Sequence, residues 1–343
     1  IDVYYHPGHE FNLERFVRGS KEALEYYTKN FGPYQHKILR IVEFPRYATF
    51  AQAFPNTIPY SEGLGFIARV DDKNPKDLDY PFYVTAHEVA HQWWAHQLVG
   101  GNTRGATVLS ETLAEYSALM VMKKTVGPAK MRRFLRYDLN QYLMGRSEER
   151  RQEWPLADNE NQAYIHYNKG SLAMYLLQDI IGEDKVNGVL RDLLKTHGQK
   201  GPPYASVTAL INGLRQVTPP EQAYLIDDLF EKIVLFDNRA LSATATKRGD
   251  GKYAVTIKVQ AGKLTAGAQG EERDAPLHDL IEIGVDDANG HPLLRERLRM
   301  TARVASYTVL VSGRPAKAGI DPDNKLIDRK PDDNMVGVEI DEP

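Results

Sequence analysis

Two histidines and a glutamate lie within an apolar helical segment, and this feature constrains the fold more than any other in the chain. The segment Tyr83–Trp94 has the sequence Y-V-T-A-H-E-V-A-H-Q-W-W, with His87 and His91 four residues apart and Glu88 between them. Residues four apart lie on one helical face, so both imidazoles can reach one point. Buried polar side chains need a partner, and a shared metal ion would supply one. The segment therefore predicts a buried helix at a metal site.

A third ligand is expected from a following helix. The segment Ser110–Tyr116 offers Glu111 and Glu115, four residues apart and so on one face. We assign Glu111 to the metal. Glu115 is better placed to accept a hydrogen bond from a ligating imidazole and so fix its tautomer, and it remains the alternative ligand. The competing interpretation is a solvated helix surface, which fits the apolar neighbours of the motif poorly.

These ligands predict one Zn²⁺ per chain with catalytic chemistry. Zinc held by three protein ligands keeps one position open for water and lowers the pKa of that water towards ~7. Glu88, one step around the helix, would then accept the proton and pass it to a leaving amine. A purely structural zinc site has no use for such a base, so Glu88 favours an enzyme.

The apolar pattern of the first two thirds of the chain is mainly helical. Residues 12–30 place apolar side chains on one helical face, with Asn12 at the expected N-cap. Residues 37–44 have the composition of a buried strand, and residues 58–68 predict a second strand interrupted by glycines. Glycine within a strand often marks a close approach by another group. From about residue 80 to residue 236 the pattern is helical.

The pattern then changes to the two-residue alternation of β-strands. Apolar residues alternate over 253–259, 281–285 and 307–311, with turn residues between these runs. Several short strands separated by turns are typical of a sandwich. We therefore predict the α+β class: a mostly helical domain with a small edge sheet over residues 1–237, then an antiparallel β-sandwich with an extended C-terminal tail over residues 238–343.

Composition excludes several other functions. The sequence has no cysteine, and so no disulfide framework, thiolate ligand or thiol nucleophile. Its 43 basic and 46 acidic residues are well mixed, and a net charge of −3 offers nothing to attract nucleic acid. No apolar run approaches the ~18 residues that cross a bilayer. Because the chain opens within an alternating apolar stretch at Ile1, we expect it to be part of a longer protein.

The motifs resemble those of the thermolysin-like zinc aminopeptidases, the gluzincin family of aminopeptidase N and leukotriene hydrolase. That family has H-E-x-x-H, usually 18 residues, and then an Asn-Glu pair leading into a helix that ends Ala-Glu-Tyr. Here 19 residues, Gln92–Ser110, intervene, and Ser110 takes the place of Asn. The resemblance covers about residues 12–235. It implies a thermolysin-like catalytic domain that hydrolyses peptides.

Two further segments resemble this family. Tyr167–Gly170 (Y-N-K-G) matches its Tyr-x-Lys-Gly, whose tyrosine hydroxyl donates to the oxyanion. This implies a catalytic role for Tyr167, with Tyr164 as the alternative. The family also has Gly-x-Met-Glu-Asn on an edge strand, where the Glu binds the free α-amino group of the substrate. Pro59–Gly63 (P-Y-S-E-G) keeps only the glutamate, so the resemblance assigns this role to Glu62, against an ordinary edge-strand glutamate.

These residues are compatible with three functions. The first is a zinc aminopeptidase that releases amino-terminal residues from peptides, using Glu88, Tyr167 and Glu62. The second is a zinc endopeptidase or processing peptidase, because most of the amine-binding pattern is missing. The third is an inactive, metal-stabilised binding module of a membrane transporter, which the presence of Glu88 disfavours.

The residues around the motifs are most similar to peptidase domains fused to bacterial ABC-2-type transporter permeases. Examples are H-Q-W-W-A-H-Q over 91–97 and L-S-E-T-L-A-E-Y over 109–116. This resemblance implies a membrane-embedded N-terminal segment outside this chain. It also implies association with a bacterial inner membrane for the intact protein.

Overall fold

The computed structural model describes residues 1–74 and 77–341 and divides the chain into two compact units. The first contains Ile1–Tyr142 and Trp154–Glu231. The second contains Leu143–Glu153 and Lys232–Pro343. The longer segment of the second unit begins at Lys232, shortly before the domain boundary predicted after residue 237. The second unit also includes residues 143–153, which come from the middle of the helical region.

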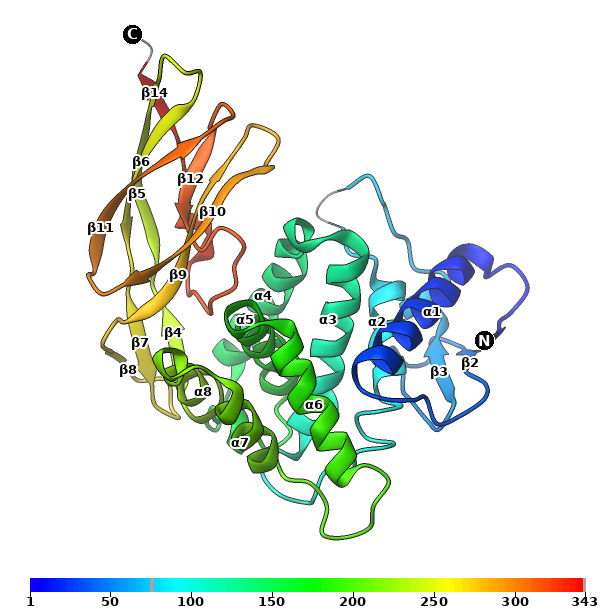
Figure 1. Ribbon diagram of the computed structural model, residues 1–343. Helices are drawn as coiled ribbons and strands as arrows, with labels where there is room; N and C mark the ends of the chain where they lie inside the picture. Colours follow the sequence, from blue (N-terminus) through cyan, green and yellow to red (C-terminus); the bar gives the residue numbers. More distant parts are fainter. Residues whose placement is uncertain (75–76, 342–343) are drawn as a thin grey trace. The chain divides into compact units, whose positions relative to one another are not determined.

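The first unit is mainly helical (Figure 1). The helix predicted over residues 12–30 is confirmed as α1. Two helices, α3 and α5, end at glycines with positive φ, Gly127 at 83° and Gly182 at 101°, a conformation that glycine adopts at low cost. The helices are α1 (Leu13–Asn30), α2 (Tyr80–Ala90), α3 (Leu113–Val126), α4 (Arg132–Glu148), α5 (Gly170–Ile181), α6 (Glu183–His197), α7 (Val207–Val217) and α8 (Tyr224–Ile226).

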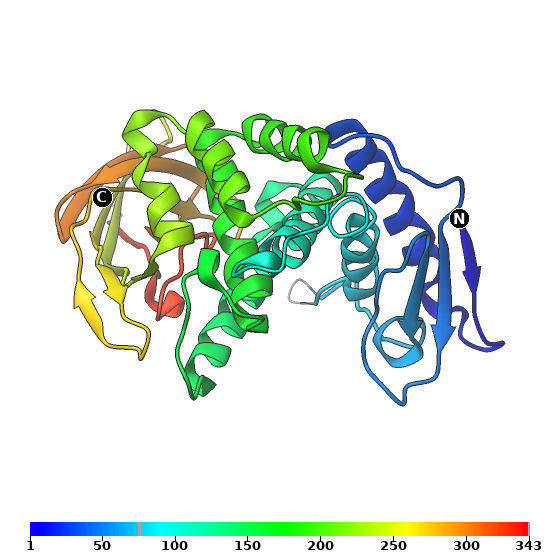
Figure 2. The same cartoon turned by 90° about the horizontal axis from the view of Figure 1, so that it is seen from below.

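A small parallel sheet lies beside α1, as Figure 2 shows. Its strands are β1 (Asp2–Tyr4), β2 (Arg40–Phe44) and β3 (Thr57–Ser61), in the order β1-β2-β3. The outer side of β3 is occupied by residues 50–54, which run antiparallel to it. Gln52 N donates to Pro59 O at 3.1 Å, and Ser61 N donates to Phe50 O at 3.0 Å. Strand β3 is the edge strand of this sheet, as the resemblance implied, although residues 50–54 pair with part of its outer side.

The strand predicted over residues 58–68 gives way after β3 to a π-helical turn, Glu62–Phe66. Gly65 in this turn meets an aromatic ring: a Cβ added there would lie 2.4 Å from a ring carbon of Tyr60. Asn12 occupies the predicted N-cap position of α1, but its side chain does not cap the helix. Its amide donates instead to Gly65 O at 2.6 Å, which fixes the turn.

Helix α2 lies at the centre of the first unit. It begins where Asp79 Oδ1 accepts a hydrogen bond from Phe82 N at 3.2 Å, an N-cap that satisfies a free amide. Trp93 and Trp94, just beyond its end, are fully buried. Trp94 Nε1 donates to Ser117 Oγ on α3 at 2.9 Å. Most residues of α2 are buried, and the polar side chains of His87 and Glu88 are among them.

The second unit is a β-sandwich. Two four-stranded sheets, β10-β9-β12-β13 and β11-β6-β5-β14, pack face to face, beside a third sheet, β4-β7-β8. All pairs are antiparallel except β14 with β5, which is parallel. The strands are β4 (Ile233–Phe236), β5 (Arg239–Lys247), β6 (Tyr253–Gln260), β7 (Lys263–Ala266), β8 (Glu272–Asp274), β9 (Asp279–Asp286), β10 (Pro292–Met300), β11 (Val304–Val311), β12 (Lys317–Ile320), β13 (Met335–Gly337) and β14 (Glu339–Asp341).

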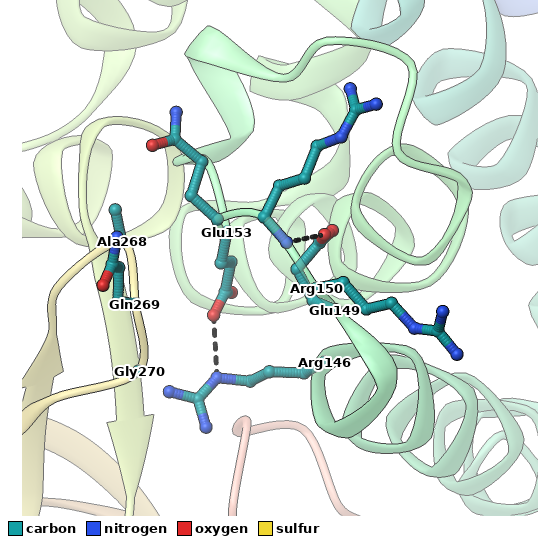
Figure 3. Close-up of a pocket in the computed structure, with 9 residues that line it drawn as sticks. Arg146, Glu149, Arg150, Glu153, Ala268, Gln269 and Gly270 are labelled. Atoms are coloured by element: carbon teal, nitrogen blue, oxygen red, sulfur yellow. Dashed lines mark hydrogen bonds and ion pairs between the residues drawn. The ribbon is translucent and has the colours of Figure 1, made fainter.

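A pocket of about 340 Å³ opens within the second unit, between residues 146–153 and the turn 268–270 (Figure 3). Arg146 beside it is fixed by Glu153 at 2.7 Å and by Glu272 at 3.2 Å. None of the site residues predicted from the sequence lines this pocket. In the part of the chain that the structure describes, no helix has both the length and the apolar character to span a bilayer.

Candidate active site

His87, near the end of α2, and His91, which directly follows the helix, direct the same ring nitrogen to one place. His87 Nε2 and His91 Nε2 lie 3.0 Å apart. Glu111 Oε2 lies 3.4 Å from the first nitrogen and 3.3 Å from the second, although it comes from a different element. The structure thus brings together the three side chains predicted as metal ligands.

Groups near the Nδ1 atoms orient the two imidazole rings. His91 Nδ1 donates to Trp94 O at 2.9 Å. His87 Nδ1 lies 3.1 Å from Glu115 Oε1, without the alignment of a full hydrogen bond. A protonated Nδ1 leaves Nε2 as the ligating nitrogen. Tyr83 OH donates to the other oxygen of Glu115. Tyr83 was not predicted as part of the site, although it lies four residues before His87 and so on the same helical face.

Glu111 lies in a second π-helical turn, Val108–Thr112, which leads directly into α3. Such turns are rare in proteins, and those that occur are often found at functional sites. Burial alone would raise the pKa of Glu111, but the imidazoles of His87 and His91 lower it well below its ordinary value. The carboxylate therefore stays ionised beside the two nitrogens.

Glu88 is buried next to this cluster, with 6% of its surface exposed. Its Oε2 has no hydrogen-bond partner among the described residues. Burial raises the pKa of Glu88, and the charges of His87 and His91 oppose that rise. A carboxylate with a raised pKa and an unused oxygen is suited to take up a proton.

A third π-helical turn, Tyr164–Lys169, carries Tyr167. The ring of Tyr167 lies 5.9 Å from the ring of His87. Burial raises the pKa of Tyr167, and the charge of Glu111 adds to the rise, so the phenol keeps its proton and remains a donor. The alternative, Tyr164, stacks on Tyr142 at a centroid distance of 6.0 Å.

His166 joins the turn of Tyr167 to the turn of Glu111. It is buried, Asn159 Nδ2 donates to its Nδ1 at 3.0 Å, and Thr112 Oγ1 donates to its carbonyl oxygen at 2.6 Å. Burial lowers the pKa of His166 to about 4, so this imidazole is neutral at pH 7. No local sequence pattern indicates this role, because its partners come from two other segments.

Glu62 faces a different group of side chains. Its Oε1 lies 3.6 Å from Arg46 Nε, and its Oε2 lies 3.9 Å from His9 Nδ1. His9 also contacts the buried carboxylate of Glu43 directly. Glu62, His9 and Glu43 could also surround an ion. However, the direct contact of His9 with Glu43 and the nearby guanidinium already balance these charges.

The cluster of His87, His91 and Glu111 suits a divalent metal. Two imidazole nitrogens and one carboxylate oxygen are a ligand set that catalytic zinc uses. Glu111 Oε2 is buried and has no hydrogen-bond partner within the described chain. Two Nε2 atoms 3.0 Å apart need a cation or a shared proton between their lone pairs. The residues present therefore fit a metal ion held by His87, His91 and Glu111.

Residues 16–219 match the family described as the peptidase family M1 domain, which covers more than half of the chain. The chain belongs to the M1 peptidase family. The site residues predicted from the sequence, from Glu62 to Tyr167, lie within the matched part of the M1 domain. The resemblance stated from the sequence motifs is thereby confirmed at the level of the family.

Two similar proteins give the extent of the likeness. Human endoplasmic reticulum aminopeptidase 2 is 25% identical over 206 residues, which are 57% of this chain and 21% of that protein. The crystal structure of Legionella pneumophila aminopeptidase A in complex with aspartic acid matches with a TM-score of 0.56 and 15% identity, over 99% of this chain and 36% of that chain. At this identity the structural likeness shows the fold alone.

The chain thus spans about a fifth of the human relative and about a third of the bacterial one. The fold class predicted from the sequence is confirmed. The names of these relatives give no support to fusion with a transporter permease, and the membrane-embedded partner segment stays a prediction.

Proposed function

We propose that this chain is a zinc-dependent metallopeptidase that releases amino-terminal residues from peptides. The observation that carries the proposal is the convergence of His87, His91 and Glu111 beside the buried carboxylate of Glu88. Membership of the M1 family and the likeness to a human protein named as an aminopeptidase support it.

Each residue of the site has a distinct role in this proposal. His87, His91 and Glu111 hold the zinc ion, which when bound activates a water molecule and polarises the scissile carbonyl. Glu88 takes a proton from the water at Oε2 and passes it to the leaving amine. Tyr167 donates its phenolic hydrogen to the carbonyl oxygen, where negative charge develops.

Replacement of Glu88 by Gln separates metal binding from catalysis. We expect Glu88→Gln to keep its zinc, measured by metal analysis, and to lose peptide hydrolysis by roughly 10²- to 10⁴-fold. Glu25→Gln, which removes an exposed carboxylate paired with Lys124, is the matched control and should keep the parent activity. Equal turnover by Glu88→Gln and the parent would remove Glu88 from the mechanism. Absence of any peptidase activity in the zinc-loaded parent would refute the proposed function.

Glu62 is proposed to pair with the α-ammonium group of the substrate. The nearby guanidinium of Arg46 does not block this role permanently, because the Arg46 side chain is 70% exposed and can move aside. A free-amine peptide should then be cleaved faster than its N-acetylated twin. That preference should disappear in Glu62→Gln.

Two observations favour an endopeptidase as the second candidate. Residues 50–54 (F-A-Q-A-F), which cover the edge of β3, contain no carboxylate for an ammonium group. Glu62 already has Arg46 beside it. Equal cleavage of the free and acetylated peptides would select this candidate and remove the proposed role of Glu62. Both candidates keep the same metal site.

A further inference from the structure

Asp138 is a buried carboxyl group that the proposed mechanism does not use. It lies on α4, is 4% exposed, and contacts the two residues that frame the end of the turn carrying Tyr167. Asn168 Nδ2 donates to Asp138 Oδ1 at 3.0 Å, and Ser171 Oγ lies 2.7 Å from Asp138 Oδ2. We propose that Asp138 is a positioning residue that holds Tyr167 in place through Asn168 and Ser171. The inference rests on the proposed function, because the role of Tyr167 is part of it.

The contacts form a closed ring. Ser171 Oγ lies 2.8 Å from Asn168 O as well as 2.7 Å from Asp138 Oδ2. The side-chain amide of Asn168 is therefore hydrogen-bonded to Asp138, and its main-chain carbonyl is hydrogen-bonded to Ser171. Asn168 directly follows Tyr167. The turn that carries Tyr167 is π-helical, a geometry that is rare in proteins and often found at functional sites. These side-chain links join its end to α4.

Proton counting favours the neutral acid. The Ser171 hydroxyl has one hydrogen and cannot donate both to Asn168 O and to Asp138. If Asp138 is protonated, its Oδ2 donates to Ser171 Oγ, which then donates to Asn168 O, and every group is satisfied. Burial raises the pKa of Asp138 well above its ordinary value, and the charge of Glu115 raises it further. No Lys, Arg or His contacts Asp138 among the interactions of the described residues.

Asparagine imitates the neutral acid, and this gives the test. In Asp138→Asn the amide oxygen accepts from Asn168 and the amide nitrogen donates to Ser171, so the ring survives. We expect this variant to stay within about threefold of the parent kcat. Asp138→Ala breaks the ring and should lower kcat by roughly 10- to 100-fold, since small misplacements of catalytic groups are costly. KM and zinc content should change little, because neither depends on the Tyr167 hydroxyl.

Two further variants keep the test decisive. Asn168→Ala removes one link without touching the buried acid, and it should reproduce the kcat loss even if Asp138→Ala folds poorly. The control is Asp321→Ala in the second unit, where Asp321 is equally buried and accepts from Lys325 N at 2.9 Å. This control should lower stability but leave kcat unchanged. In a Tyr167→Phe background, Asp138→Ala should add little to the loss, since both act through one hydroxyl.

A readout without turnover separates this inference from the proposed function. With 3-fluorotyrosine at position 167, the ¹⁹F resonance should shift or broaden in Asp138→Ala and stay near the parent value in Asp138→Asn. An unchanged resonance in Asp138→Ala, or an equal change in both variants, overturns the inference whether or not the parent cleaves peptides. An inactive zinc-loaded parent with the expected ¹⁹F pattern overturns the proposed function alone.

Discussion

At the scale of single residues, the orientation of the two metal-binding histidines depends on the groups near their Nδ1 atoms. His91 Nδ1 donates to the carbonyl oxygen of Trp94, and His87 Nδ1 lies 3.1 Å from the carboxylate of Glu115. Glu115 is in turn held by Tyr83 OH. On a solvated helix surface, water would satisfy the histidine nitrogens, and such partners would not be needed. The orientation of both Nε2 atoms is therefore a property of the surrounding residues as much as of the motif.

Glu115 should accordingly control metal affinity. Glu115→Ala removes the carboxylate beside His87 Nδ1 and leaves Tyr83 OH without its acceptor. We expect zinc affinity to fall by roughly 10- to 100-fold, as for other partners of ligating histidines. A competition titration with a zinc chelator measures this. Glu25→Ala, at an exposed ion pair, provides the comparison, and a parent-like affinity in Glu115→Ala would contradict the prediction.

The two tyrosines of the third π-helical turn should behave differently. Tyr167 lies beside His87, whereas Tyr164 stacks on Tyr142. Tyr167→Phe should lower kcat by about 10²- to 10³-fold, the usual cost of one oxyanion donor. Tyr164→Phe should leave kcat within about threefold of the parent. Steady-state kinetics of both variants show which tyrosine donates to the oxyanion. A larger loss of kcat in Tyr164→Phe than in Tyr167→Phe would assign this role to Tyr164.

At the scale of elements, three π-helical turns carry Glu62, Glu111 and Tyr167. The turns over 108–112 and 164–169 touch each other through the Thr112 hydroxyl and His166 O. Gly170, where α5 begins, allows this contact: a Cβ there would lie 2.4 Å from Thr112 Oγ1. The spacing between the acid and the phenol therefore depends on a close approach that only glycine permits.

Gly170→Ala should disturb that approach. The added methyl group forces Thr112 or α5 to move, which costs about 1–3 kcal/mol in a packed interior. We expect a lower melting temperature and a lower kcat. Gly188→Ala on α6 is the control, because the added Cβ would lie 3.8 Å from its nearest neighbour, the end of the Arg191 side chain, and alanine favours a helix by about 0.5–1 kcal/mol. If both variants melted at or above the parent temperature, the contact would not be tight.

The sequence predicted the elements whose signal is local. The spacing of His87, Glu88 and His91 required a helix, and the apolar flanks required its burial. Strand β3 lies at the edge of its sheet, as expected, but its pairing with residues 50–54 was not predicted, because that pairing depends on a turn at Asn56, which adopts a φ of 55°. π-Helical turns have no periodic signature of their own. Partners such as Asp138 and Asn168, 30 residues apart, leave no pattern in either segment.

At the scale of the whole molecule, the chain has two units with separate cores. The sandwich core includes Ile257, Ile281 and Ile283, all fully buried, and the metal cluster lies entirely within the other unit. A stretch of the helical region, residues 143–153, belongs to the sandwich unit: Glu153 N donates to Ala268 O at 2.7 Å. The assignment of residues 143–153 to the sandwich unit depends on contacts between residues far apart in the sequence. The spacing of apolar residues does not reveal such contacts.

Zinc should therefore stabilise one unit selectively. A ligand present at 100 times its Kd, and bound only by the folded state, adds about 2.7 kcal/mol. For a unit of this size that corresponds to a rise of roughly 5–10 °C in melting temperature. Differential scanning calorimetry of the full chain, with zinc or with chelator, should show two transitions, of which zinc moves one. In His91→Ala the zinc-dependent shift should vanish.

Ile283→Val assigns the other transition. This substitution removes one buried methylene from the sandwich and should lower only the zinc-insensitive transition, by about 0.5–1.5 kcal/mol. Because the metal ligands and Ile283 lie in different units, the two effects should add without coupling. A single transition, or a zinc-dependent shift of both, would mean that the two cores unfold together and that metal binding is linked to the stability of the entire chain.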